Sequence, residues 1–151
     1  MRVPAWWPRG PTIDEARWVM VDVEASGLDP HRDRLLAIAA IALRVDWHDR
    51  RIAVDLGDSF EVVLRQDQAS ARDNILLHGI GVQRQQGGVP APQALRAFGE
   101  FADRSPLLAF HAPFDRILVG RHAEAALGAA PPNPAAASPA PPRTSQEPWA
   151  R

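Results

Sequence analysis

The sequence predicts a single mixed α/β domain, and three observations support this fold class. The first half of the chain contains three apolar stretches that are typical of strands joined by short connections. In the second half, the spacing of apolar residues changes to that of amphipathic helices. A short apolar stretch at 107–110 then follows a helix, as a strand laid parallel to an earlier one does. The length of 151 residues is sufficient for one hydrophobic core.

The first half is predicted to form an antiparallel meander of three strands. Residues 17–25 are rich in valine, and residues 35–45 are a long apolar run whose alanines also suit a helix. Residues 59–65 (SFEVVLR) alternate apolar and polar, and they follow DLGD at 55–58, which is typical of a turn. Short connections between successive strands favour antiparallel pairing.

Three helices are predicted in the second half. Residues 71–78 form a short helix that ends at Gly79, and residues 92–104 have apolar side chains on one face and charged ones opposite. The last helix, 113–127, has proline in its first turn and Gly128 at its end, which is the usual placement of the two residues.

The composition excludes several classes of protein. A net charge of −1 argues against binding to nucleic acid through a general basic surface, although phosphate can still be held through metal ions. The absence of cysteine excludes disulfides and thiolate metal sites. No run of about 18 apolar residues occurs, so we expect no membrane span. The start of the sequence lacks the apolar core of a signal peptide, and the expected location is the cytoplasm.

The composition changes near residue 128. Of the 23 residues at 129–151, 14 are Pro or Ala, and Trp149 is the only large apolar side chain. Such a segment buries too little surface to offset the conformational entropy lost on ordering. We therefore expect a folded domain at 17–128 and a disordered tail at 129–151.

Two carboxylates, Asp22 and Glu24, stand at the end of the first predicted strand. Residues two apart in a strand point to the same face, so these side chains lie together and repel each other. A divalent cation such as Mg²⁺ or Mn²⁺, which prefers hard oxygen ligands, would relieve the repulsion. The alternative is a polar stripe facing solvent on an edge strand, and for this short pattern alone it is the favoured explanation.

A second group of polar residues follows the strand predicted at 107–110. His111 comes at the strand end, and Asp115 falls in the first turn of the next helix. The helix dipole is sufficient to explain an acid in that position. Taken alone, Asp115 is more often structural than functional.

Taken together, three stretches resemble the DnaQ-like (DEDD, histidine-type) 3′-5′ exonuclease family, which includes the proofreading epsilon subunit of bacterial DNA polymerase III. VDVEASGLDP is similar to the family's first motif, and AFHAPFD is similar to the second, with His111 and Asp115 in register. Between them, ILLHGIG resembles a His-Gly-Ile element of the family. The resemblance covers roughly residues 18–128. It implies an RNase H-like α/β fold, a mixed sheet with flanking helices.

The resemblance also implies a chemistry and its partners. The reaction would be two-metal hydrolysis of phosphodiester bonds at the 3′ ends of single-stranded DNA or RNA, with two Mg²⁺ or Mn²⁺ ions. Asp22 would bridge both ions, Glu24 would hold the ion that activates water, and Asp115 would support the second ion. A DNA polymerase is the protein partner that the family suggests.

Five further residues are implied to contact the substrate. The backbone at Ala25 and Ser26 would meet the 3′-terminal nucleotide. Leu28 would wedge against its base with Phe114 nearby, although core packing is an equally good explanation of both side chains. His78, at a helix end, has two possible roles, contact with a phosphate and capping of the helix.

The family's third motif, a histidine base followed five residues later by a carboxylate, is absent. The only acids after Asp115 are Glu124 and Glu147, and the residue five positions after His122 is Leu127. We therefore read His122 as a surface or partly buried helical residue. A shifted reading frame would account for the Pro- and Ala-rich segment that stands in place of the motif.

These departures limit the expected activity. We expect the fold to be C-terminally incomplete, with apolar surface left uncovered on the sheet, and hydrolysis to be impaired. The alternative is a catalytically inactive nucleic-acid- or partner-binding remnant of the same fold. A third reading, an unrelated α/β domain whose acids decorate the surface, explains the three matching stretches poorly.

Overall fold

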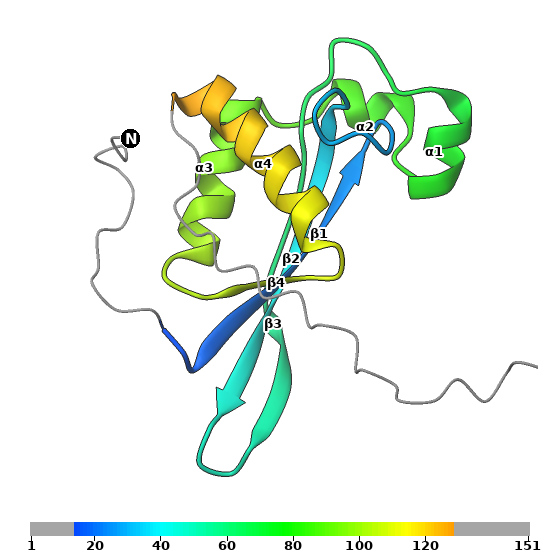
Figure 1. Ribbon diagram of the computed structural model, residues 1–151. Coiled ribbons are helices and arrows are strands. Elements are labelled where there is room, and N and C mark those ends of the chain that lie inside the picture. Colours follow the sequence, from blue (N-terminus) through cyan, green and yellow to red (C-terminus); the bar gives the residue numbers. More distant parts are fainter. Residues whose placement is uncertain (1–13, 129–151) are drawn as a thin grey trace, which may run out of the picture.

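The computed structural model describes residues 14–128 as a four-stranded sheet with helices (Figure 1). The order of the strands across the sheet is β3-β2-β1-β4. In chain order the elements are β1 (Arg17–Ala25), β2 (Leu35–Asp46), β3 (Arg51–Val63), α1 (Arg72–His78), α2 (Val82–Gln86), α3 (Ala91–Ala102), β4 (Leu107–Ala109) and α4 (Ala112–Leu127).

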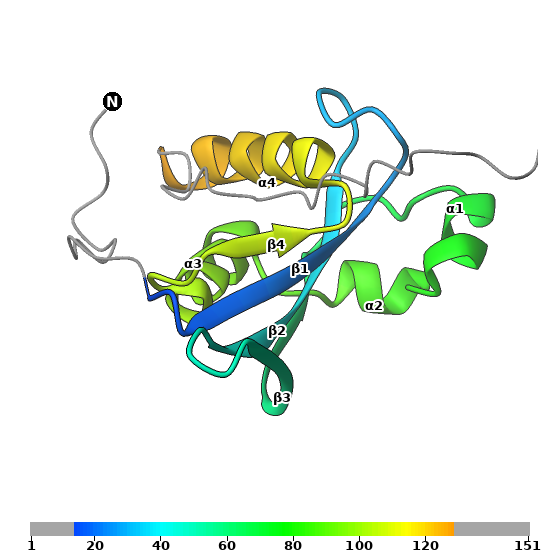
Figure 2. The same ribbon diagram turned by 60° about the horizontal axis from the view of Figure 1, so that its bottom comes forward.

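The sheet is mixed, as the sequence predicted. β1 pairs antiparallel with β2, and β2 pairs antiparallel with β3, so the first three strands form the expected meander. β4 lies parallel to β1 on its other side, with Val21 opposite Ala109 (Figure 2). Because β1 and β4 run in the same direction, their carboxyl ends meet at one edge of the sheet, where α/β sheets commonly bind ligands.

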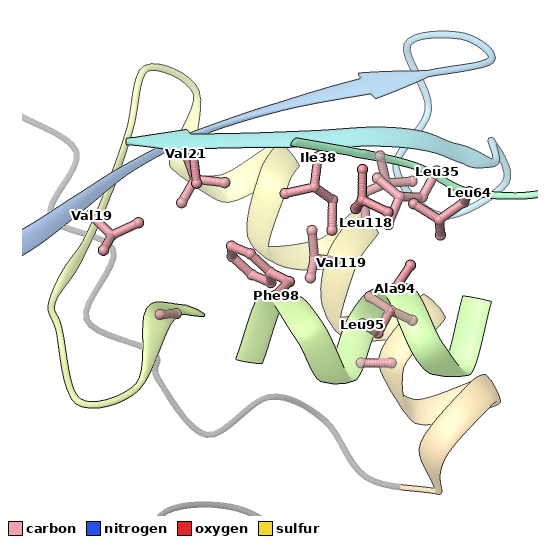
Figure 3. Packing of buried hydrophobic residues seen from close by; sticks show 14 residues of the cluster. Val19, Val21, Leu35, Ile38, Leu64, Ala94, Leu95, Phe98, Leu118 and Val119 are labelled. Atoms are coloured by element: carbon pink, nitrogen blue, oxygen red, sulfur yellow. The ribbon is translucent and has the colours of Figure 1, made fainter. Parts of the chain in front are cut away.

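The main core lies between one face of the sheet and helices α3 and α4 (Figure 3). Val19 and Val21 of β1 point into it, as do Phe98 of α3 and Leu118 of α4. Side chains alternate between the two faces along a strand, so Met20 and Asp22, which alternate with these valines, turn away from the core. Asp22 is accordingly exposed.

A smaller apolar cluster anchors the region around α1 and α2 to the sheet. Leu36 and Ala37 of β2 are buried there together with Ile80, which lies between the two helices. Their contact places α1 and α2 beside the carboxyl end of β1 (Figure 1).

The prediction for β3 was wrong in one respect. The strand is much longer than the expected 59–65, and DLGD is part of it rather than a turn. The pairing with β2 passes from Asp55 directly to Ser59, so residues 56–58 bulge out of the ladder, while the hairpin turns at 47–50. The polar residues that suggested a turn form ion pairs instead, since Asp58 binds Arg17 of β1.

The predicted helices are confirmed with small shifts of their ends. α1 and α4 end at Gly79 and Gly128, whose φ angles of 73° and 70° are left-handed and suit glycine. α3 ends at Ala102, two residues before the expected end. α2 was not predicted, because its five residues are too few for an apolar period to show.

Two further expectations concern membranes and the tail. Within residues 14–128, no helix is both long and apolar enough to cross a membrane. The predicted disordered tail at 129–151 lies outside the described residues.

Candidate functional site

Three carboxylates stand where the parallel strands β1 and β4 end. Asp22 and Glu24 are near the end of β1, and both occupy strand positions that alternate with the buried valines. Asp115 is in the first turn of α4, which begins directly after β4 with His111 as its N-cap residue. The backbone N–H of Asp115 donates to the His111 carbonyl at 3.2 Å. The topology therefore brings both predicted acidic motifs to one edge of the sheet.

The charges of these carboxylates interact. The pKa of Asp115 is raised to about 6, first by burial and then by the charge of Asp22, while His111 acts in the opposite direction. The pKa of Glu24 is also raised, first by burial and then by Asp22. Mutual repulsion of this kind indicates that Asp22 lies near both other carboxylates.

Within the described part of the chain, the negative charge of this cluster is not offset by an ion pair. Among residues 14–128, none of the ion pairs includes Asp22, Glu24 or Asp115. The chain contains 17 basic residues, and several arginines, among them Arg17, Arg44 and Arg84, pair with acids elsewhere in the molecule. The three carboxylates thus carry a local excess of negative charge.

The donor set fits a divalent cation in charge and in chemistry. Carboxylate oxygens are the ligands that Mg²⁺ and Mn²⁺ prefer, and a cation would remove the repulsion that raises the pKa of Asp115. As the side chains stand, no three His, Cys, Asp or Glu residues of the described chain are grouped closely enough to hold one ion. Asp22, Glu24 and Asp115 would have to rotate toward a common point to do so.

The segment after β1, predicted to meet the substrate, is a tightly hydrogen-bonded loop. The Ser26 N–H donates to the Arg34 carbonyl at 2.9 Å, and the Ser26 hydroxyl donates to Asp33 Oδ1 at 3.0 Å. Asp33 Oδ2 also accepts the N–H of Asp29. A Cβ at Gly27 would lie 2.5 Å from Asp33 Oδ2, so the close approach of this carboxylate requires glycine.

Arg121 connects the same loop to α4, the helix that carries the second motif. Its guanidinium donates to the carbonyl of Pro30 at 3.1 Å and to the carbonyl of Asp33. The loop that follows Asp22 and the helix that carries Asp115 are therefore directly connected.

The structure separates the two apolar residues of the predicted substrate site. Leu28 is 91% exposed, so core packing does not explain it. Phe114 is partly buried against the main core and stacks on His111, with 5.9 Å between ring centroids. Core packing therefore accounts for Phe114, and contact with substrate stays a prediction for both residues.

His78 has both ring nitrogens engaged within the protein. Nδ1 accepts the N–H of Ile80 at 2.9 Å, and Nε2 lies 2.7 Å from Asn74 Oδ1 and 3.2 Å from Ser70 Oγ. Burial lowers its pKa, which favours the neutral ring. None of these bonds reaches a carbonyl of the last turn of α1, which Gly79 caps through its own N–H, so the capping role and the phosphate contact of His78 both stay predictions.

Sequence reasoning missed the partners of His78. Asn74 Nδ2 donates to the carbonyl of Ala25 at 3.0 Å and so links α1 to the end of β1. Gln85 of α2 is fully buried and binds Ser70 and Ile80. The spacing of four residues between Asn74 and His78, which puts them on one helix face, was the available signal.

Phe110 was also missed as a surface residue. It follows β4 and is 98% exposed, although it belonged to a stretch predicted to be a buried strand. The strand ends one residue earlier, at Ala109, and Phe110 therefore lies at the same edge as the carboxylates.

His122 is partly buried in α4, within the range that the sequence predicted. Its Nε2 accepts the N–H of Leu35 at 3.1 Å, and Nδ1 lies 2.8 Å from the Leu118 carbonyl. Nε2 joins α4 to β2 and Nδ1 bonds within α4, so in this arrangement His122 has no free nitrogen for the role of a base.

No family model matches the chain, and no curated protein matches its sequence. Solved structures of exonuclease I are similar in fold. The product-bound form has a TM-score of 0.61 at 15% identity over 75% of this chain and 26% of that chain. E. coli exonuclease I in complex with a dT13 oligonucleotide has a TM-score of 0.59 at 16% identity, over 74% of this chain and 24% of that chain.

The complex of ExoI with SSB-Ct is similar to the same degree, with a TM-score of 0.60 and 16% identity. The described residues thus have the predicted RNase H-like fold, a mixed sheet flanked by helices. The chain matches only about a quarter of the length of these neighbours.

Proposed function

We propose that this chain is a metal-dependent 3′-5′ exonuclease domain of the DEDD type. The observation that carries the proposal is the group of three interacting carboxylates at the carboxyl ends of β1 and β4, which have no ion-pair partners among residues 14–128. The fold shared with exonuclease I and the three motif-like stretches support it. Asp22, Glu24 and Asp115 are the proposed metal ligands.

Two bound Mg²⁺ or Mn²⁺ ions would supply charge stabilisation and an activated water for in-line displacement at phosphorus. The residues of the chain have distinct parts in this scheme. Asp115, whose pKa is about 6 without a cation, gives up its proton when it becomes a ligand. The clamped backbone at Ala25 and Ser26 orients the terminal nucleotide, and the exposed Leu28 packs against its base.

Single-stranded DNA is the proposed substrate class. The similar exonuclease I structures include complexes with a dT13 and with a 5cy-dA13 oligonucleotide. RNA ends stay an alternative, because the site itself shows no group that selects the sugar. A DNA polymerase as protein partner rests on the DnaQ-like resemblance, and a location in the cytoplasm stays a prediction.

One observation favours a second candidate, a non-catalytic module that binds nucleic-acid ends. Among the described residues, the one histidine that follows Asp115 is His122, whose ring nitrogens are both engaged, and there is no ready grouping for one ion. Loss of a general base lowers a rate by about 10²–10⁴-fold, which would leave binding without useful hydrolysis.

A 3′-labelled single-stranded oligonucleotide distinguishes the candidates. The chain is incubated with it in Mg²⁺ or Mn²⁺, alongside Asp22→Ala and the control Asp49→Ala in the distant β2–β3 turn. The exonuclease proposal predicts stepwise shortening that Asp22→Ala abolishes and Asp49→Ala retains.

Binding of the oligonucleotide without any shortening would favour the second candidate. Shortening that survives in Asp22→Ala would show that the cleaving site lies elsewhere and would reject the proposed ligands.

A further inference from the structure

Asn74 and Arg34 hold opposite sides of one peptide unit at the end of β1. The Ala25 carbonyl accepts a hydrogen bond from Asn74 Nδ2 at 3.0 Å, and the Ser26 N–H donates to the Arg34 carbonyl at 2.9 Å. These two groups belong to the peptide bond between Ala25 and Ser26. A side chain from α1, about 50 residues later in the sequence, thus clamps the backbone directly after Glu24.

The side-chain amide of Asn74 is itself held in one orientation. Because His78 Nδ1 accepts the N–H of Ile80, the ring proton lies on Nε2 and donates to Asn74 Oδ1 at 2.7 Å. The oxygen of Asn74 therefore faces His78, and its nitrogen faces Ala25. Networks of this kind fix side-chain orientation more firmly than single bonds do.

Ser70 and the buried Gln85 form further hydrogen bonds that support Asn74 and His78. Ser70 Oγ lies 3.2 Å from His78 Nε2 and accepts a bond from Gln85, which is fully buried. Gln85 also accepts the N–H of Ser70 and donates to the Ile80 carbonyl. No buried side-chain nitrogen or oxygen of the described residues lacks a partner, so the network is complete within that range.

The hydrogen bond from Asn74 to the Ala25 carbonyl, called the clamp below, lies at an irregular point of β1. The pairing of β1 with β2 shifts in register between Glu24 and Ala25. Such irregularities re-aim side chains, and they leave the local backbone less constrained by the ladder. Glu24 stands at this point, one residue before the peptide between Ala25 and Ser26 that Asn74 and Arg34 hold.

We propose that Asn74, oriented by His78, is a positioning residue that holds the Glu24 side chain in a single orientation beside Asp22. The inference rests on the proposed function only in taking Glu24 as a metal ligand. The fixed orientation of the Glu24 side chain, which is the other part of the proposal, does not depend on bound metal.

The test compares Asn74→Ala with the control Asp73→Ala, an exposed neighbour on the same helix. Alanine is a good helix former, so neither change is expected to unfold α1. In the metal-free protein, NMR three-bond couplings report χ1 of Glu24, and hydrogen exchange reports the Ser26 amide. We expect Asn74→Ala to give averaged couplings and faster exchange, and Asp73→Ala to match the wild type.

Mn²⁺ titration by calorimetry adds the functional readout. Loss of a group that supports a ligand costs about 10–100-fold in metal affinity, and we expect that loss in Asn74→Ala alone. His78→Phe keeps a ring but removes both nitrogens. We expect it to average the Glu24 couplings, speed exchange of the Ser26 amide and weaken Mn²⁺ binding, each by less than Asn74→Ala does.

The outcomes separate the two proposals. Unchanged Glu24 couplings in Asn74→Ala would overturn the inference whether or not metal binds. Faster exchange with wild-type Mn²⁺ affinity would also overturn it, since the clamp would then have no bearing on the site. If the wild type binds no Mn²⁺, the proposed function fails, and the couplings alone decide the positioning role.

Discussion

The carboxylates near the two ends of β1 are in opposite electrostatic environments. At the start of the strand, Arg17 binds both oxygens of Asp58 at 2.8 and 2.9 Å, and the pKa of Asp58 is lowered, chiefly by this bond. At the other end, Asp22 and Glu24 have no ion-pair partner among the described residues, and the pKa of Glu24 is raised. The start of β1 is thus paired with an acid of β3, whereas the end of β1 carries acids without such a partner.

This difference separates an end of the sheet that ion pairs stabilise from the end that holds the candidate site. The chain has 17 basic residues, yet none of those at 14–128 forms an ion pair with the second cluster. Carboxylates that repel each other raise the free energy of the metal-free protein, and a bound cation would recover that free energy. The paired end holds the fold together, and the unpaired end is the candidate site.

The largest predicted effect on stability comes from breaking the paired end. Asp58→Ala leaves Arg17, whose side chain is only 14% exposed, without its carboxylate partner. We expect the free energy of unfolding to fall by about 2 kcal/mol, as measured by urea denaturation.

Asp55→Ala is the matched control for that variant. Asp55 pairs with Arg44 on an exposed part of the same hairpin, where ion pairs contribute about 0–1 kcal/mol. Equal losses in the two variants would contradict the view that burial makes the Arg17 pair important.

The opposite sign is predicted at the unpaired end. With a pKa of about 6 in the folded protein against an ordinary value of 3.8, Asp115 keeps its proton when folded over a range in which the unfolded chain releases it. Its contribution therefore lowers stability as pH rises from about 4 to 6, and the penalty persists above pH 6.

Asp115→Asn removes this penalty. In metal-free protein at pH 7.5, we expect the free energy of unfolding to rise by about 1–2 kcal/mol, after allowance for solvent screening. At pH 4 the gain should vanish. A variant less stable than the wild type at pH 7.5 would show that Asp115 is a structural helix cap.

The smallest effect is predicted for the exposed Leu28. Because the side chain is 91% exposed, Leu28→Ala should change the free energy of unfolding by less than about 0.5 kcal/mol. Fluorescence anisotropy with a labelled single-stranded oligonucleotide should show about fivefold weaker binding, the equivalent of about 1 kcal/mol of lost apolar contact. Unchanged binding would remove Leu28 from the substrate site.

Much of the fold could be predicted from the sequence because the signals were local. Valine alternation defined β1, and glycines marked the ends of α1 and α4. DLGD was misread as a turn because its acids are paired with arginines that are distant in the sequence, and local patterns carry no information on such partners. α2 was too short for any period to appear.

The site was predictable only in its charged residues. The acids stood out because they follow apolar strands, whereas Asn74 resembled any polar residue of a short helix. Its bond to Ala25 joins positions 49 residues apart, and it depends on a buried glutamine that composition alone would place on the surface. Contacts of this kind become visible only when the chain is folded.

The central claim is that the unpaired acids at the end of β1 form a metal site. Calorimetric titration of the full chain with Mn²⁺ at pH 7.5, repeated with Asp22→Asn and with Asp58→Asn, tests it most directly. We predict saturable binding to the wild type and to Asp58→Asn, and a loss of at least about 100-fold in affinity in Asp22→Asn, more than supporting residues usually cost. Equal binding to the wild type and Asp22→Asn would contradict the claim, as would a wild type that binds no Mn²⁺.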